Sequence, residues 1–263
     1  MVSMVPLEKF CGMGIGLDLG SGKLVFGEGV KKVEPDLRTW AQMKDLFAGG
    51  PRGREKLPEW LYAMYREVCN EGDFERIANA GLRFDLTLFP SLSINGEYNK
   101  TYGHFHPKVK GSELTYPEVY EVVYGQGHFL LQNDENVLLI EAGQGDKILI
   151  PPNYGHVTIN PGKGILLIAN WIERNFRSEY GEYRERKGAM YFETEKGWEK
   201  NPNYENAPEM RKIKVKDIPE FGLFKGRPMY ETGMENLGKL DFLKNPGKYL
   251  EVFDGYLKLK KLG

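Results

Sequence analysis

The sequence predicts a mostly β fold, a sandwich or barrel of antiparallel strands with a few helices around it. Between residues 81 and 172, short runs rich in Val, Ile, Leu, Phe and Tyr recur about every ten residues, separated by turn residues. No helix-length periodic segment interrupts them, which argues against a parallel sheet with crossover helices. The chain has 263 residues with 32 Gly and 15 Tyr, a composition typical of strands and tight turns. The predicted strands are 82–89, 98–105, 118–123, 127–132, 137–141, 147–150, 156–160 and 164–172.

The segments before this region are shorter and more varied. Residues 1–35 mix apolar pairs with Gly, which predicts a strand or hairpin arm. Residues 36–48 predict a helix, because their apolar side chains share one face, Asp36 is a suitable N-cap and a Gly-Gly-Pro sequence follows. Residues 51–57 are a charged loop, and the apolar segment 61–65 is compatible with a strand or a helix.

The segments after this region are more polar. Residues 173–212 are rich in tyrosine and predict one or two strands followed by a loop. A short strand is expected at 213–215, and one or two helices between Met234 and Leu259.

Composition excludes several classes of protein. The 36 Lys and Arg residues balance 37 Asp and Glu residues, so the basic excess of a nucleic-acid binder is missing. The apolar runs are too short to span a bilayer, and the first residues lack the pattern of a secretory signal, so no membrane partner is expected. Two cysteines, Cys11 and Cys69, fit a reducing compartment, and we expect a cytoplasmic protein.

Three of the four histidines and one glutamate form a pattern typical of a metal site. His104 and His106 lie two residues apart in a predicted strand, so both project to the same face. Glu118 and His156 begin later predicted strands that sheet closure can bring alongside. Three imidazoles and one carboxylate suit Fe²⁺, Mn²⁺, Ni²⁺ or Zn²⁺. An isolated His-x-His is common in cores and on surfaces, but here Glu118 stands seven residues before Gly125, which makes the pattern far more specific.

A second block, Gly-x5-Pro-x-Asn-x2-His-x3-Asn at 145–160, completes the pattern. Together the two blocks resemble the two cupin motifs, and the resemblance implies a cupin double-stranded β-barrel, or jelly roll, with the metal inside and a few peripheral helices. Asn153 replaces the usual Gly of the second motif, and the gap between His106 and Glu118 is longer than is common.

Longer strings sharpen this resemblance. Residues 100–107, 116–125, 130–132 and 150–156 are similar to the archaeal, cupin-type glucose-6-phosphate isomerases, and the similarity extends over about 30–195. That family interconverts glucose 6-phosphate and fructose 6-phosphate, so a phosphosugar substrate and a homodimer are expected.

The resemblance also implies domain limits. We expect a cupin domain over 1–195 with its barrel core at about 81–172. A C-terminal extension over 196–263 should pack on the barrel.

Carried over to this chain, the resemblance implies one divalent transition metal ion, with Fe²⁺ first and Mn²⁺, Ni²⁺ or Zn²⁺ as alternatives. His128 matches no functional position. The implied metal ligands are His104, His106, Glu118 and His156. The implied substrate-binding residues are Tyr62, Thr87, Thr101, Gly103, Tyr120 and Tyr180.

The chemistry of such an isomerisation points to Glu118. Moving hydrogen between carbons 1 and 2 through a cis-enediol needs a base near the carbon and a positive centre beside the developing oxyanion. Glu118 is the only carboxylate in the pattern and is the candidate catalytic base. A carboxylate bound tightly to a metal is a poor base, so a direct hydride shift remains the alternative.

Two other functions stay open at this point. A different cupin metalloenzyme, such as a dioxygenase, uses a similar set of three histidines and one glutamate. A non-enzymatic sugar-binding cupin is the second alternative, although such proteins often lose ligands that this chain keeps. In the dioxygenase case Tyr62, Thr101 and Gly103 would be structural.

Overall fold

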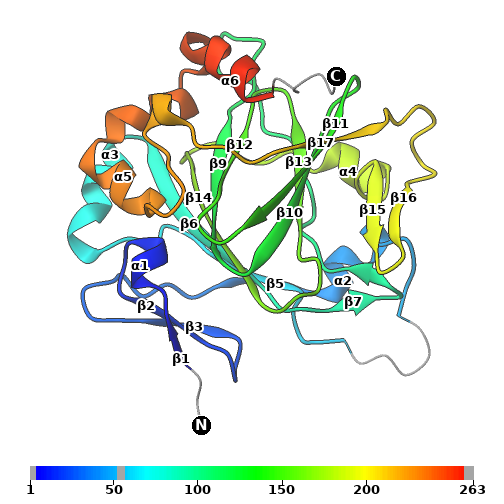
Figure 1. The fold of residues 1–263 in the computed structure, drawn as a ribbon, viewed down its shortest axis with the longest axis horizontal. Helices are drawn as coiled ribbons and strands as arrows, with labels where there is room; N and C mark the ends of the chain where they lie inside the picture. Colours follow the sequence, from blue (N-terminus) through cyan, green and yellow to red (C-terminus); the bar gives the residue numbers. More distant parts are fainter. Residues whose placement is uncertain (1–3, 52–56, 258–263) are drawn as a thin grey trace.

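The structure is a computed structural model that describes residues 4–51 and 57–257. Most of the predicted charged loop at 51–57, and the end of the predicted C-terminal helical region, lie outside these ranges. The described part is mostly β, as predicted, with strands at its centre and helices at its periphery (Figure 1).

The largest sheet forms one wall of the core. Its strands have the order β12-β9-β14-β6-β5-β4, and every neighbouring pair is antiparallel. Most of its residues are buried, because the runs of Val, Ile, Leu and Phe in the sequence pack on both faces. The bounds are β12 (Lys147–Ile150), β9 (Glu118–Tyr124), β14 (Leu166–Glu173), β6 (Leu82–Phe89), β5 (Tyr62–Tyr65) and β4 (Asp36–Arg38).

A second sheet faces the first. Its order is β13-β10-β11-β17; β17 runs parallel to β11 and the other pairs are antiparallel. The two facing sheets confirm the predicted cupin-type jelly roll, although their ladders do not close into a complete barrel within the described residues. The bounds are β13 (Gly155–Ile159), β10 (Gln126–Gln132), β11 (Val137–Gly143) and β17 (Met210–Ile213).

Two smaller sheets flank this core. The N-terminal arm forms a three-stranded antiparallel sheet, as expected of a hairpin arm, with β1 (Met4–Pro6), β2 (Ile15–Asp18) and β3 (Lys23–Phe26). On the other side lies a sheet with the order β16-β15-β8-β7. Its bounds are β16 (Gly197–Lys200), β15 (Tyr191–Thr194), β8 (Glu97–Tyr98) and β7 (Ser93–Ile94).

The helices are short and peripheral. The α-helices are α1 (Glu8–Cys11), α2 (Trp40–Met43), α3 (Phe74–Asn79), α4 (Gly181–Glu185), α5 (Met229–Glu235) and α6 (Leu250–Leu257). The 3-10 helices are η1 (Lys44–Leu46), η2 (Glu71–Asp73), η3 (Pro219–Phe221), η4 (Leu237–Leu243) and η5 (Pro246–Tyr249).

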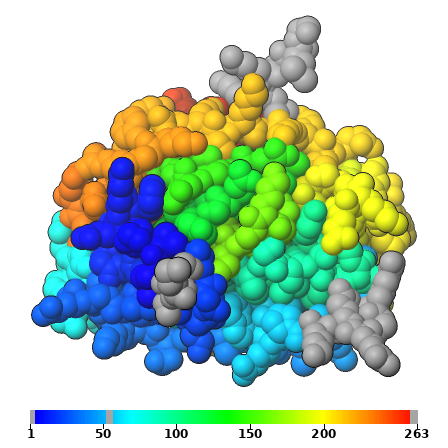
Figure 2. Space-filling model, turned by 60° about the horizontal axis from the view of Figure 1, so that its bottom comes forward, coloured from blue at the N-terminus to red at the C-terminus, as the bar shows by residue number. Residues whose placement is uncertain are grey.

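The C-terminal segment packs on the outer face of the largest sheet. The indole Nε1 of Trp171 donates a hydrogen bond to the carbonyl of Met229, and the Met229 N–H donates to Oε2 of Glu121 at 2.7 Å. The N-terminal arm meets the same segment, because a Cβ on Gly12 would lie 2.9 Å from the Glu231 side chain. Figure 2 shows the blue N-terminal region beside the orange C-terminal region on one face of the molecule.

Two predicted elements were wrong in extent. The predicted helix 36–48 is a strand, β4, followed by α2 and η1, because residues 36–38 pair with β5. The N-cap is Thr39, whose backbone N–H bonds the Gln42 side chain, and not Asp36. The predicted strand 98–105 reduces to β8 and isolated bridges, since Gly103 adopts a left-handed φ of 77° that breaks a regular ladder.

None of the helices in the described residues is both long and apolar enough to cross a membrane.

Candidate metal centre and substrate pocket

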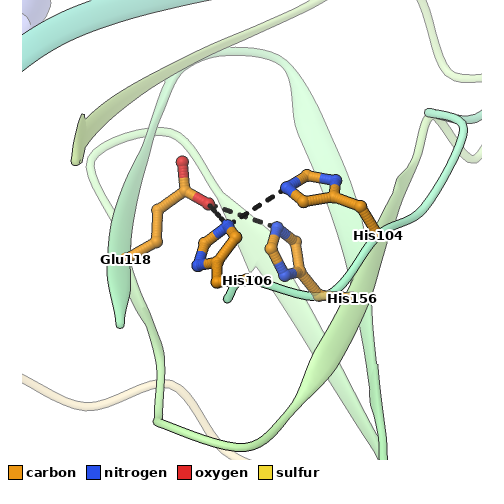
Figure 3. A group of neighbouring side chains, drawn as sticks. All are labelled: His104, His106, Glu118 and His156. Atoms are coloured by element: carbon orange, nitrogen blue, oxygen red, sulfur yellow. Dashed lines mark hydrogen bonds and ion pairs between the residues drawn. The ribbon is translucent and has the colours of Figure 1, made fainter. Parts of the chain in front are cut away.

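Four side chains from separate parts of the chain converge inside the jelly roll. His104 and His106 come from the extended segment after β8, Glu118 begins β9, and His156 lies on β13. The backbones of His104 and His156 hydrogen-bond each other in both directions, at 3.1 and 3.0 Å. One ligand atom from each residue lies within 4.8 Å of all the others (Figure 3).

The arrangement fits a bound cation. Nε2 of His104 lies 3.1 Å from Nε2 of His106. Oε2 of Glu118 lies 3.3 Å from Nε2 of His106 and 3.2 Å from Nε2 of His156. This oxygen is buried and has no hydrogen-bond partner among the described residues. Imidazole nitrogens and a carboxylate oxygen that face one another at this distance are the donor set of a divalent transition metal.

Neighbouring groups fix the orientation of these donors. His106 donates from Nδ1 to the carbonyl of Tyr116 at 2.8 Å, which leaves its Nε2 lone pair free for a cation. The Asn170 side chain donates to Oε1 of Glu118 at 2.7 Å. The Tyr120 hydroxyl lies 3.1 Å from Nε2 of His156. These contacts hold the ligands in place before any ion binds.

The protonation states also suit a metal. Burial lowers the pKa of His104 well below its ordinary value, and the neighbouring imidazoles of His156 and His106 lower it further. Burial likewise lowers the pKa of His156. Burial alone would raise the pKa of Glu118, but the adjacent imidazoles of His106 and His156 bring it below its ordinary value. Neutral imidazoles beside an ionised carboxylate are the forms that bind a cation.

Tyr62 and Thr87 share one face of the largest sheet. Thr87 pairs with Met64, and Tyr62 stands two residues before Met64, on the same side of β5. Tyr62 stacks on Phe89 with ring centroids 5.5 Å apart, and its hydroxyl accepts a hydrogen bond from the Tyr102 N–H. Burial raises the pKa of Tyr62 to about 12, so it stays a neutral donor.

Thr101 and Gly103 lie across the interior from this face, beside strand β13 of the second sheet. The Thr101 hydroxyl accepts a hydrogen bond from the Thr158 N–H at 2.9 Å, which leaves its own proton free to donate. A side chain on Gly103 would collide with the Tyr183 ring at 2.3 Å, so close packing and the left-handed backbone both require glycine there.

The two predicted sugar-site tyrosines border the histidines. Tyr120 is buried, and burial together with the charge of Glu118 raises its pKa well above 10. Tyr180 contacts the rings of Tyr102 at 5.0 Å and His104 at 5.6 Å. The structure therefore brings both tyrosines to the metal centre.

A groove on the surface borders one of the four clustered residues, His106. It has a volume of about 570 Å³ and reaches His106 from between Lys108, Thr115 and Glu179.

Two residues of the site were missed by the sequence reasoning. Asn170 holds Glu118, and Arg38 lies with its guanidinium 6.0 Å from the rings of both Tyr62 and Tyr102. Nε of Arg38 is buried without a hydrogen bond among the described residues. No motif signals either residue; only the strand register places them.

The jelly roll and its three-histidine, one-glutamate cluster define a cupin protein with a candidate metal centre. A sequence model of the family described as Glucose-6-phosphate isomerase (GPI) matches residues 53–209. The chain belongs to this family, and it is an enzyme of the sugar-phosphate isomerase class.

Individual relatives agree with the family match. A glucose-6-phosphate isomerase of Thermococcus litoralis is 27% identical over 215 residues, which cover 79% of this chain and 95% of the relative. One from Pyrococcus horikoshii is 28% identical over 204 residues, covering 74% and 97%.

Solved structures are more distant. Oxalate oxidase in complex with the substrate analogue glycolate has a TM-score of 0.36 and 14% identity, covering 52% of this chain and 64% of that one. A cupin 2 conserved barrel domain protein from Rhodopseudomonas palustris has a TM-score of 0.32 and 13% identity, covering 48% and 72%. Likeness at this level carries no argument about function.

Proposed function

We propose that this protein is a metal-dependent aldose–ketose isomerase that interconverts glucose 6-phosphate and fructose 6-phosphate. The observation that carries the proposal is the convergence of His104, His106, Glu118 and His156 around one point. The names of the relatives, all glucose-6-phosphate isomerases, supply the substrate.

These four residues would hold one divalent ion, with Fe²⁺ as the first candidate and Mn²⁺, Ni²⁺ or Zn²⁺ as alternatives. Such an ion, when bound, polarises the carbonyl and hydroxyl oxygens of carbons 1 and 2.

The role of Glu118 depends on the route. In the enediol route, Glu118 takes the proton from carbon 2 and returns it to carbon 1. Asn170 occupies Oε1, so Oε2 is the oxygen left to take the proton, and in this route it does so when it is not bound to the ion. In a direct hydride shift, Glu118 would act only as a ligand.

The phosphate end of the substrate would lie farther along the same face. We assign its recognition to the hydroxyls of Tyr62, Thr87 and Thr101 and the backbone N–H of Gly103. Arg38 adds a positive charge beside Tyr62, which a doubly charged phosphate favours. Tyr120 and Tyr180 would contact the sugar.

Further proposals concern the whole chain. We propose a homodimer, a cupin unit over 1–195 and an extension over 196–263 that packs on it. The contacts of Met229 with Trp171 and Glu121 support the packing of the extension.

A coupled assay tests the proposal directly. Fructose 6-phosphate should form from glucose 6-phosphate when a divalent metal is present, and the rate should fall when a chelator removes the metal. Oxygen consumption without isomerisation would favour a dioxygenase-like cupin. Sugar binding without turnover would favour a binding protein.

A further inference from the structure

The sequence departs from the usual cupin motifs at two places, and the structure brings these two places together. One departure is the long loop 107–117 between His106 and Glu118, which folds back on itself as a small hairpin. The other departure is Asn153, which stands where Gly is usual, in the turn between β12 and β13. The proposed function gives neither of them a role.

Thr115 of the hairpin and Asn153 of the turn exchange two hydrogen bonds. The Thr115 N–H donates to Oδ1 of Asn153 at 2.9 Å, and the Asn153 N–H donates to the Thr115 hydroxyl oxygen at 2.7 Å. Asn153 has a left-handed φ of 66°, which Asn adopts more readily than most residues. Each side chain therefore binds the backbone of the other residue, and we call this pair of bonds the clasp. A glycine at position 153 could accept no such bond from the hairpin.

Tyr116 directly follows Thr115 and contacts His106 by two routes. The Tyr116 carbonyl accepts the hydrogen bond from Nδ1 of His106 at 2.8 Å. The Tyr116 ring stacks on Phe176, with centroids 5.0 Å apart and planes 17° apart, and the Phe176 ring lies 4.6 Å from the His106 ring. The position of Tyr116 therefore fixes one edge of the His106 imidazole and supports the phenyl ring that packs against it.

The two other clustered histidines are held in a different way. The backbones of His104 and His156 hydrogen-bond each other, so β13 holds both of them without help from the hairpin. His106 takes its orienting hydrogen bond from Tyr116 in the hairpin. The clasp joins that hairpin to the turn three residues before His156, so it sets the place of His106 relative to the other two.

We propose that Thr115 and Asn153 are a positioning pair that holds His106 in the geometry for metal binding before an ion arrives. The inference rests on the proposed function only for the presence of an ion at the four-residue cluster. Neither residue belongs to that cluster, and the pair acts through Tyr116. Without the clasp, the hairpin would have to be ordered when the ion binds, and that loss of conformational entropy would lower the affinity.

Asn153→Gly is the variant that tests the clasp. Glycine adopts a positive φ freely, so the turn should keep its shape while the side-chain bond is lost. Calorimetric titration of Zn²⁺ into the chelator-treated protein should give an affinity about tenfold weaker than in the wild type, the lower end of the loss seen when an orienting partner is removed. Asn153→Asp keeps an acceptor oxygen for the Thr115 N–H and should recover most of the affinity.

A double-mutant cycle tests whether the two residues act as one unit. Thr115→Val removes the hydroxyl that accepts the Asn153 N–H. The variant with both changes should bind Zn²⁺ within about twofold of Asn153→Gly, because the clasp is already broken there. Losses that multiply in the double variant would overturn the inference.

Ser112→Ala is the matched control in the same hairpin. The Ser112 hydroxyl accepts the Leu114 N–H at 3.0 Å and takes no part in the clasp. This variant should lower the free energy of unfolding and leave Zn²⁺ affinity unchanged. A merely structural clasp would behave in the same way, so unchanged Zn²⁺ affinity in Asn153→Gly, or an equal loss in Ser112→Ala, would overturn the inference.

The Nδ1 proton of His106 gives a second readout that needs no ion. Its exchange with solvent, followed by NMR on the metal-free protein, should be faster in Asn153→Gly than in the wild type and in Ser112→Ala. The same exchange rate in all three proteins would overturn the inference. A wild type that binds Zn²⁺ no better than His156→Ala would refute the proposed metal centre, and the proton exchange would still decide whether the clasp holds His106.

Discussion

Asn170 donates a hydrogen bond from Nδ2 to Oε1 of Glu118 at 2.7 Å, and Oε2 of the same carboxylate faces the imidazoles of His106 and His156. The two oxygens therefore have separate tasks. One is fixed by an amide from β14, and the other is presented to the centre. The carboxylate cannot rotate without breaking a buried hydrogen bond.

Removal of this amide should weaken metal binding. Asn170→Leu leaves Oε1 of Glu118 buried without a donor, and loss of such an orienting partner typically costs ten- to a hundredfold in metal affinity. Metal titration of the purified variant measures the effect. Asn160→Leu is the control. Asn160 stands four residues along the chain from His156, and its amide donates to backbone carbonyls and accepts from the Gly162 N–H, with no contact to the cluster in the described part of the chain. Asn160→Leu should lose stability but keep the metal affinity of the wild type. Equal metal affinity in Asn160→Leu and Asn170→Leu would contradict the role of Asn170.

His156→Ala should reduce metal content and isomerase activity together. It removes one of four converging donors, so we expect a larger loss of metal affinity than in Asn170→Leu. Elemental analysis and the coupled assay measure the two quantities. His128→Ala is the matched control. Nδ1 of His128 lies 2.8 Å from Oε1 of Glu193, and neither residue belongs to the cluster of four. Full metal content and turnover in His156→Ala would show that the assigned site is wrong.

The strands of the core were predictable from the chain alone. Residues 82–89 and 147–150 match β6 and β12 residue for residue, because both are short segments rich in Leu, Ile and Phe between turn residues. Residues 36–38 were misread because Leu37 and Trp40 also fit a helical face. The deciding interaction, pairing of β4 with β5, comes from a distant part of the chain.

The cluster of four candidate ligands was also predictable, since their spacing matches a known motif and the structure brings all four together. Asn170 and Arg38 were not. Each lies in a segment without a motif, and each reaches the site only through strand register, which a single sequence does not define.

Thr101→Val should raise KM for glucose 6-phosphate by about ten- to a hundredfold. The change removes one hydrogen bond to a charged group, while metal content should stay constant. The variant also leaves the Thr158 N–H without its acceptor, so a stability loss of about 1–3 kcal/mol is expected. Thr194→Val, in the exposed β15–β16 turn, loses local hydrogen bonds and should leave KM unchanged. An unchanged KM in Thr101→Val would remove the case for phosphate recognition there.

Cys11 should make stability fall at alkaline pH. Burial raises the pKa of its thiol from 9.0 to about 12. The folded protein therefore keeps a proton that the unfolded chain releases above pH 9, and stability declines as pH rises from 9 to 12, by at most about 1.4 kcal/mol for each pH unit. Urea unfolding at several pH values measures the free energy of unfolding, which should decline less steeply with rising pH for Cys11→Ala than for the wild type. The same decline in both proteins would refute this contribution of Cys11.

The buried pair of Glu121 and Lys147 should control docking of the C-terminal segment. Lys147 Nζ lies 2.7 Å from Oε1 of Glu121, each side chain is 1% exposed, and Oε2 accepts the Met229 N–H. Lys147→Met leaves the buried carboxylate of Glu121 without its positive partner, so the free energy of unfolding should drop by about 3–5 kcal/mol.

The double variant Glu121→Met/Lys147→Met separates two causes of that loss. It leaves no uncompensated charge, so most of the stability should return, since well-packed apolar replacements of buried pairs are often neutral. The Met229 N–H still loses its acceptor, so the C-terminal segment should remain looser than in the wild type. Urea unfolding measures the first effect, and amide exchange at residues 229–235 measures the second. A double variant as unstable as Lys147→Met would show that the destabilisation does not come from the unpaired charge.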